Sequence, residues 1–133
     1  MDKSQFTDYI ECFNRDDFEG FSKCYAEDVV LELPSKVLRG RQAIVDFYRL
    51  VKARVRETLQ INQVIADSEG LAAEIYTEFH ALEDWPDFLV GPLRKGESIR
   101  IISFVHYVIR DGKFAHIKSA RLRRLPDISP AAR

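Results

Sequence analysis

The sequence predicts an α+β fold in which helices cover one face of a curved antiparallel sheet. Near the N-terminus, apolar residues recur three and four positions apart, which is the period of an amphipathic helix. Later they alternate with polar residues, as in a strand with one buried face. Asp111-Gly112 joins two long apolar runs, which is a strong hairpin signal. A bent sheet wrapped around a helix is expected to form a cone with an internal cavity.

Three helices are expected. The first, capped by Asp2 or Ser4, ends near Asn14, and Asp16 is the expected N-cap of the second. The third begins at Gly40. The inward faces are apolar and consist of Phe6, Tyr9, Ile10, Phe13, then Phe18, Phe21, Tyr25, then Ile44, Phe47, Val51 and Val55. The charged side of the third helix is expected to face solvent and holds Arg41, Asp46, Arg49, Lys52, Arg54 and Arg56.

Two short strands and a four-stranded antiparallel meander complete the expected fold. Pro34 ends the first short strand, and the last two strands are the arms of the Asp111-Gly112 hairpin. Between the middle strands and this hairpin, residues 83–96 contain Trp-Pro and Gly-Pro pairs, which predict a structured loop. The strands are 28–33, 37–39, 57–65, 71–81, 100–110 and 113–125. One domain is expected, 1–133, with a core of 4–125 and a tail of 126–133.

Composition excludes several classes of partner. The 133 residues carry a net charge of -1, which provides no long-range attraction for nucleic acid or an anionic membrane. No apolar run has the length of a membrane span, and the N-terminus lacks a signal-peptide core. The two cysteines, Cys12 and Cys24, show neither a metal spacing nor a disulfide framework. We therefore expect a cytoplasmic protein without a metal or a cofactor.

Two segments carry a family resemblance, residues 9–33 (YIECFNRDDFEGFSKCYAEDVVLEL) and residues 38–48 (LRGRQAIVDFY). Together with the Asp-Gly-Lys turn and the Ser-Ala-Arg strand near the C-terminus, they resemble the nuclear transport factor two-like superfamily, and within it the SnoaL-like branch, a distant relative of the ketosteroid isomerases. The resemblance extends over residues 4–125 and implies a cystatin-like, cone-shaped α+β barrel around the N-terminal helices. The superfamily contains both enzymes and binding proteins, so the function must be inferred from the site.

Comparison with the ketosteroid isomerases implies that one of their three catalytic groups is present. Tyr9 matches the family's oxyanion-binding tyrosine on the first helix. The general-base aspartate, which precedes a proline, is replaced by Leu33 before Pro34. The second oxyanion donor, an aspartic acid before a histidine, is replaced by Val105 before His106. Ketosteroid isomerisation by that mechanism is therefore excluded.

The catalytic candidates that remain are Tyr9, Asp84 and Asp87. Tyr9 is either an oxyanion donor in the cavity or a core tyrosine whose hydroxyl is bonded internally. The segment from Asp84 to Phe88 resembles a lid that places an acid over the cavity. In the alternative interpretation, which we favour, it is a polar loop in which Trp85 and Phe88 seal the core.

The cavity wall is expected to combine apolar residues with a few polar ones that orient a ligand. A buried Arg121 would need a partner, either Glu32 or an anionic ligand, unless it is a solvated strand end. Strand alternation turns His80, His106 and His116 to the other face, unless a bulge reverses it. The predicted ligand-binding residues are Phe13, Leu33, Phe47, Gln63, Thr77, Phe79, Trp85, Phe88, Ser103, Val105, Ser119 and Arg121.

The sequence thus predicts a SnoaL-like protein that binds a small, largely apolar molecule bearing a carbonyl or hydroxyl group. If it is an enzyme, we expect cofactor-free acid/base chemistry, namely isomerisation, cyclisation or dehydration. The alternative is a non-catalytic ligand-binding or dimerisation module. Ile102, Phe104 and Val108 are expected on the outer face of the sheet, where they predict a homodimer.

Overall fold

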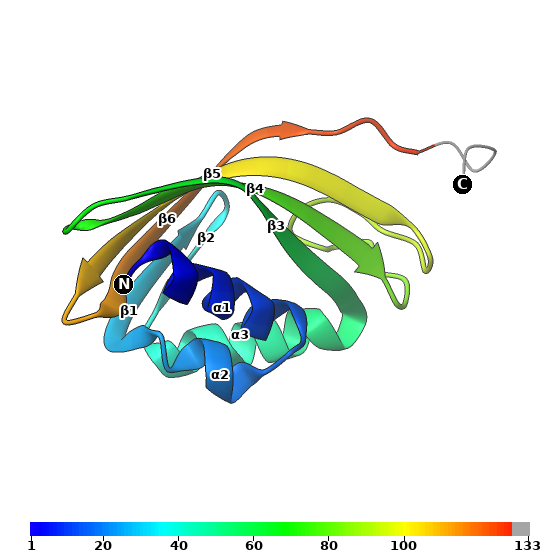
Figure 1. Ribbon diagram of the computed structural model, residues 1–133. Coiled ribbons are helices and arrows are strands. Elements are labelled where there is room, and N and C mark those ends of the chain that lie inside the picture. The colour runs from blue at the N-terminus through cyan, green and yellow to red at the C-terminus, as the bar shows by residue number, and fades with distance from the viewer. Residues whose placement is uncertain (129–133) are drawn as a thin grey trace.

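The computed structural model describes residues 1–128 as three helices and six strands, and the last part of the predicted tail, 129–133, lies outside this range. Figure 1 shows the sheet arching over the three helices, which all lie on its concave side. Within residues 1–128 no helix is long and apolar enough to cross a membrane. The elements are α1 (Lys3–Asn14), α2 (Phe18–Ser22), β1 (Tyr25–Leu33), β2 (Lys36–Arg39), α3 (Arg41–Arg54), β3 (Val55–Ala66), β4 (Gly70–Ala81), β5 (Ser98–Arg110) and β6 (Lys113–Arg124).

The sheet has the strand order β2-β1-β6-β5-β4-β3. Strands β3 to β6 form the expected antiparallel meander. The pairing of β1 with β6 is parallel, which differs from the purely antiparallel sheet that we predicted. A parallel pair requires a crossover connection, and here nearly the whole chain between β1 and β6 provides it. The sheet stays open, with β2 and β3 at its edges.

The predicted hairpin at Asp111-Gly112 is confirmed. Asp111 and Gly112 both have positive φ, 53° and 75°, and Arg110 pairs with Lys113 across the turn. Positive φ at both central residues is the geometry of a type I′ turn, whose twist matches that of the strands. This turn sets the register between strands β5 and β6.

The turn between α1 and α2 differs from the prediction. Asp17, not Asp16, is the N-cap of α2, because its carboxylate accepts a hydrogen bond from the Gly20 amide at 2.8 Å. Asp16 occupies the left-handed position, with φ of 59°. Asn14, predicted to end the helix in that conformation, remains helical, and its side chain bonds both backbone groups of Leu59 at 2.8 Å. Asn14 thereby attaches α1 to strand β3.

Helix α3 has fewer solvated charges than its sequence predicts. Lys52 is only 7% exposed, and its ammonium group donates to the Phe13 carbonyl at 2.8 Å and to Asp16 at 2.7 Å. Arg41 donates to the Tyr25 carbonyl at 2.7 and 3.1 Å. Both side chains were assigned to solvent. They are covered because the chain around the α1–α2 turn and the start of β1 packs against this side of α3.

Two apolar clusters support the sheet. The larger is aromatic and joins α1 and α2 to β1, β5 and β6, with Phe6, Phe21 and Phe114 fully buried. The smaller joins the end of α3 to β4, β5 and the 83–96 loop through Phe88 and Leu93. This loop is structured, as expected, because Trp85 and Leu93 exchange backbone hydrogen bonds.

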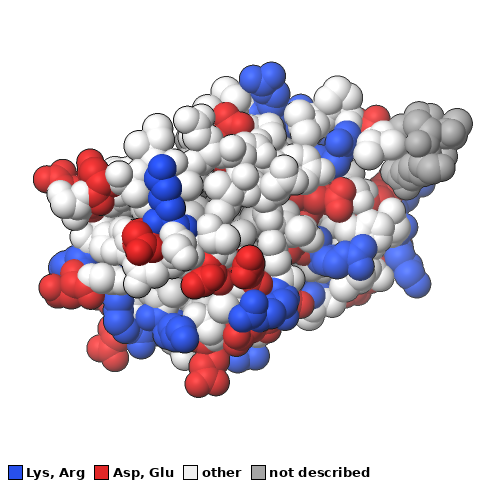
Figure 2. Space-filling view, in the orientation of Figure 1, with Lys and Arg blue, Asp and Glu red and all other residues white. Residues whose placement is uncertain are grey.

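On the face shown in Figure 2, positive and negative side chains are interspersed, so no large area has a single sign.

Candidate ligand-binding cavity

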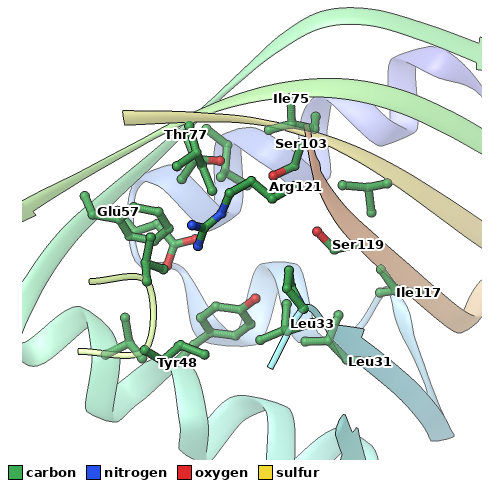
Figure 3. A pocket seen from close by; sticks show the side chains of 18 of the residues that line it. Leu31, Leu33, Tyr48, Glu57, Ile75, Thr77, Ser103, Ile117, Ser119 and Arg121 are labelled. Carbon is green, nitrogen blue, oxygen red and sulfur yellow. The ribbon is translucent and has the colours of Figure 1, made fainter. Parts of the chain in front are cut away.

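A cavity of about 130 Å³ lies between the concave face of the sheet and helices α1 and α3 (Figure 3). Its wall is mostly apolar and aromatic. Exposed lining residues, among them Pro34, Ser35 and Leu89, mark its mouth, whereas Tyr9, Phe13 and Tyr25 are buried. The structure brings together at this cavity the predicted residues Tyr9, Phe13, Leu33, Phe47, Thr77, Phe79, Phe88, Ser103, Val105, Ser119 and Arg121.

Four predicted site residues do not line the cavity. The carboxyl groups of Asp84 and Asp87 are exposed, and Asp84 accepts a hydrogen bond from the Lys95 amide at 2.8 Å, so it stabilises its own loop. The expectation that this loop places an acid over the cavity is therefore not met. Trp85 lies behind Phe88, with their ring centroids 4.8 Å apart, and seals the core as the alternative interpretation predicts.

The fourth, Gln63, is exposed on the other face of the sheet because of a bulge. The pairing of β3 with β4 shifts between Ile61 and Gln63, so Asn62 is the extra residue. Beyond the bulge Val64 packs on the core and Gln63 does not. One inserted residue reverses the face to which all later residues of a strand point. The prediction assumed regular alternation without a bulge, so it placed Gln63 on the wrong face.

The buried acid of the cavity is Glu57, which sequence reasoning missed. It lies near the start of β3, is 8% exposed and lines the cavity. Its carboxyl group makes no hydrogen bond or ion pair to any described residue. Burial raises the pKa of Glu57 to about 7, with a lowering contribution from Lys52 and a raising one from Asp16. Glu57 lies two residues before Leu59 and four before Ile61, so strand alternation predicts that it faces inward with them.

Lys52 is close to Glu57 but does not neutralise it. The nearest polar contact between them is from the Lys52 ammonium group to the Glu57 backbone carbonyl, at 3.5 Å. The ammonium group is already occupied by Phe13 and Asp16, and it also lies 4.0 Å from the centroid of the Phe13 ring. The carboxyl oxygens of Glu57 therefore remain open to the cavity.

Tyr48 is a second lining residue that the prediction missed. Burial, and next the Glu57 charge, raise the pKa of its hydroxyl well above the usual value, so it stays protonated. Among residues 1–128 the hydroxyl has no hydrogen-bond partner, and Figure 3 shows it pointing into the cavity. Tyr48 follows Ile44 by four positions and precedes Val51 by three, so it lies on the same side of α3 as these predicted inward residues.

Tyr9 lies at the cavity but shares its hydroxyl with another tyrosine. Its oxygen is 2.8 Å from that of Tyr25, and burial raises the pKa of both hydroxyls. The two hydroxyls carry two protons, and their mutual hydrogen bond uses one. No described residue accepts the other proton, which leaves it available to a ligand oxygen.

A row of polar side chains crosses the sheet opposite the helices. Ser103 on β5 pairs directly with Arg121 on β6, and Ser119 pairs with Val105. Thr77, on β4, lies two residues beyond the partner of Ser103. The side chains of these four residues have no hydrogen-bond or ion-pair partner in the described part of the chain. In Figure 3 the Arg121 guanidinium extends into the cavity toward Glu57, although no ion pair within 4 Å joins them.

The three histidines lie away from the cavity, as strand alternation predicted. His80 bonds the Ser98 hydroxyl at 2.8 Å, and His106 is exposed on the outer face. His116 pairs with Glu32. Because Glu32 contacts His116, it is not the partner of Arg121 that we considered possible. In residues 1–128 no three His, Cys, Asp or Glu side chains are grouped as metal ligands.

Comparison with solved structures places the fold. A candidate polyketide cyclase from Xanthomonas campestris pv. campestris superposes with a TM-score of 0.74 and 23% identity, over 87% of this chain and 86% of that one. An epoxide hydrolase of the LEH-like type from M. tuberculosis gives 0.72 and 13%, over 89% and 80%. A ketosteroid isomerase-like fold from Catenulispora acidiphila gives 0.71 and 10%, over 90% and 86%. At these identities the likeness establishes the fold alone.

Sequence comparison establishes the family. No curated protein matches the chain significantly. The model of the SnoaL-like domain family matches residues 6–117, which include most of α1, all elements from α2 to β5 and the first part of β6. The match agrees with the superfamily resemblance and with the open, curved sheet over N-terminal helices. The chain therefore belongs to the SnoaL-like domain family.

Proposed function

We propose that the protein binds a small, largely apolar molecule bearing a carbonyl or hydroxyl group and performs acid/base chemistry on it without a cofactor. The observation that carries this proposal is Glu57, a buried carboxyl group that faces the cavity without a protein partner and has a pKa of about 7. A group with a pKa near the working pH is best suited to both accept and donate a proton. Asp84 and Asp87 are exposed and do not line the cavity, so neither can take this role.

Tyrosine hydroxyls complete the proposed machinery. Tyr48 and the Tyr9–Tyr25 pair line the same cavity as Glu57 and stay protonated. A hydroxyl donor aimed at a substrate oxygen stabilises the negative charge that develops when a neighbouring carbon loses its proton. Isomerisation, cyclisation and dehydration all use such a step. In this proposal Glu57 moves the proton and the tyrosines hold the oxygen.

The cavity limits the size of the substrate. Its volume is about 130 Å³, and a cavity of about 150 Å³ in another protein holds a benzene molecule. A single small ring is therefore about the largest apolar body that the cavity holds. Relatives in fold that are named as an epoxide hydrolase and a candidate cyclase support chemistry on small organic molecules.

Hydrogen exchange of a small ketone tests this proposal. In D₂O at neutral pD, the protein is expected to accelerate exchange of the α-protons of cyclohexanone, as followed by ¹H NMR. Glu57→Gln should reduce the enzymatic rate by about 10²- to 10⁴-fold, the usual contribution of a positioned base. Glu78→Gln is the matched control and should leave the rate unchanged, because Glu78 is on β4 and lines neither the cavity nor the outer groove. Bound cyclohexanone without accelerated exchange would favour the non-catalytic alternative.

We also propose that the protein forms a homodimer through the outer face of the sheet. Phe104 is 48% exposed there and lies beside Ile65 in a groove that also contains Glu74 and Lys118. A surface with exposed apolar area and charges of both signs can pair with its own copy across a two-fold axis. Phe104→Glu should give a monomer in light scattering at micromolar concentration, whereas Leu50→Glu, on exposed α3, should stay dimeric. A wild-type monomer would contradict the proposal.

A further inference from the structure

We propose that the ligand of the cavity carries a carboxylate, bound by Arg121 and by the hydroxyls of Ser103 and Ser119, beside an apolar body of about one ring. This inference rests on the proposed function, since it assigns a chemical class to the substrate of the same cavity. The ligand would therefore be an aromatic or alicyclic carboxylic acid.

Arg121 is the only arginine that lines the cavity within residues 1–128. Like those of Arg39, Arg56 and Arg123, its side chain has no partner among these residues, whereas three other arginines of the sheet do. Arg100 donates to the Pro126 carbonyl, Arg110 pairs with Asp28, and Arg124 pairs with Asp127 at 3.2 Å. Arg121 lines the mouth of the cavity, points inward in Figure 3, and has no partner among residues 1–128. A guanidinium group is a planar fork that matches a carboxylate with two parallel hydrogen bonds. An exposed position at the mouth lets it meet a charged ligand without full desolvation.

The hydroxyls beside Arg121 support an oxygen-rich ligand group. Ser103 is directly opposite Arg121 across the β5–β6 ladder, and Ser119 is two residues along the same strand. Ser103 is buried, as is Thr77 on the next strand, and neither hydroxyl has a partner in the described part of the protein. Among residues 1–128 no fully buried side-chain oxygen or nitrogen lacks a partner, so these two hydroxyls are open to the cavity, where a ligand can bond them. A carboxylate can accept several such bonds at once, because its two oxygens offer about four lone-pair sites.

The charge of the cavity also favours an anion. Glu57 and Arg121 are the only acidic and basic residues that line it within residues 1–128. While Glu57 is protonated, the cavity has a net positive charge, and one carboxylate neutralises it. Most of the remaining wall is apolar and includes Leu33, Val90 and Ile101. It suits a hydrocarbon ring rather than a second charged group.

Calorimetric titration with benzoate and its uncharged isostere benzamide tests the proposal. At pH 6 the wild-type protein should bind benzoate about tenfold to hundredfold more tightly than benzamide, the range expected for hydrogen bonds to a charged group. Arg121→Gln should reduce this preference to about twofold or less. Arg123→Gln is the matched control, because Arg123 is on the same strand and does not line the cavity. Circular dichroism should show that both variants are folded.

Equal affinity for the two compounds would overturn the proposal, as would an equal loss of preference in Arg121→Gln and Arg123→Gln. Absence of binding for both compounds would overturn it as well. The proposed function is tested separately, because cyclohexanone carries no charge. Accelerated exchange of cyclohexanone without a preference for benzoate would reject only the carboxylate. A preference for benzoate without exchange would support the ligand class and reject catalysis.

Discussion

Lys52 and Glu57 are buried charged residues at the junction of α3 and β3, and their surroundings are opposite. Lys52 has three oxygen contacts, to Phe13, Asp16 and the backbone of Glu57. The carboxyl group of Glu57 has no such contact in the described residues. A buried charge with partners is part of the architecture, whereas an ionisable group held without partners is typical of a functional site. The difference is the reason that we propose a role in ligand binding for Glu57 and not for Lys52.

The largest effect on stability is expected for Glu57→Gln, with a pH dependence. The pKa of Glu57 rises from 4.5 to about 7 on folding, so wild-type stability falls as pH increases through this interval and the penalty is constant above it. The variant lacks this penalty. At pH 8.5 its free energy of unfolding should exceed that of the wild type by at most roughly 3 kcal/mol, with little difference at pH 4. Urea denaturation at both pH values measures it, and a pH-independent difference would contradict the assignment.

The second largest effect on stability is expected for Lys52, the buried charged residue that has hydrogen-bond partners. Lys52→Met should lower the free energy of unfolding by about 2 kcal/mol, because Asp16 and the Phe13 carbonyl lose a charged donor. The pKa of Glu57 should also rise further, since Lys52 lowers it. The matched control is Lys113→Met, since Lys113 is exposed on β6 outside the proposed dimer groove, and it should change stability by less than about 0.5 kcal/mol. Urea denaturation measures both free energies of unfolding. An equal decrease in the two variants would show that Lys52 has no special structural role.

Tyr9 and Tyr48 differ in the same way as Lys52 and Glu57, because the Tyr9 hydroxyl has a partner and the Tyr48 hydroxyl has none in the described residues, and smaller effects are expected. Tyr9→Phe should destabilise the protein by about 1 to 2 kcal/mol, because it leaves the buried Tyr25 hydroxyl without its partner. We also expect it to weaken ligand binding or turnover while the protein stays folded. Thermal unfolding and titration with benzamide measure the two effects. Unchanged binding and exchange rates would remove Tyr9 from the site.

The smallest effect on stability is expected for Tyr48→Phe. The Tyr48 hydroxyl has no partner in the described residues, so its loss should change the free energy of unfolding by less than about 0.5 kcal/mol. Exchange of cyclohexanone should nevertheless slow by about tenfold or more if the hydroxyl holds the substrate oxygen. A stability loss as large as that of Tyr9→Phe would show that Tyr48 is structural.

Short-range patterns predicted much of the site. The wall formed by Thr77, Ser103, Ser119 and Arg121 follows from alternation along three strands. Glu57 follows the same alternation on β3, but we predicted the acid to lie in the loop with Asp84 and Asp87. Tyr48 lies on the inward side of α3 but was not included in the predicted apolar stripe. The orientation of that loop depends on long-range contacts of Phe88 and Leu93 with the core, which no local pattern encodes.

The sequence by itself determined the hairpin turn, the antiparallel meander and the inward stripes of the helices, because each depends on backbone preferences and periodicity over a few residues. The tertiary structure decided the parallel pairing of β1 with β6, the bulge at Asn62 and the burial of Lys52. It also decided the pKa of Glu57. Desolvation depends on all the segments that surround a group and not on its neighbours in the chain, so only the folded protein makes this carboxyl group a candidate acid.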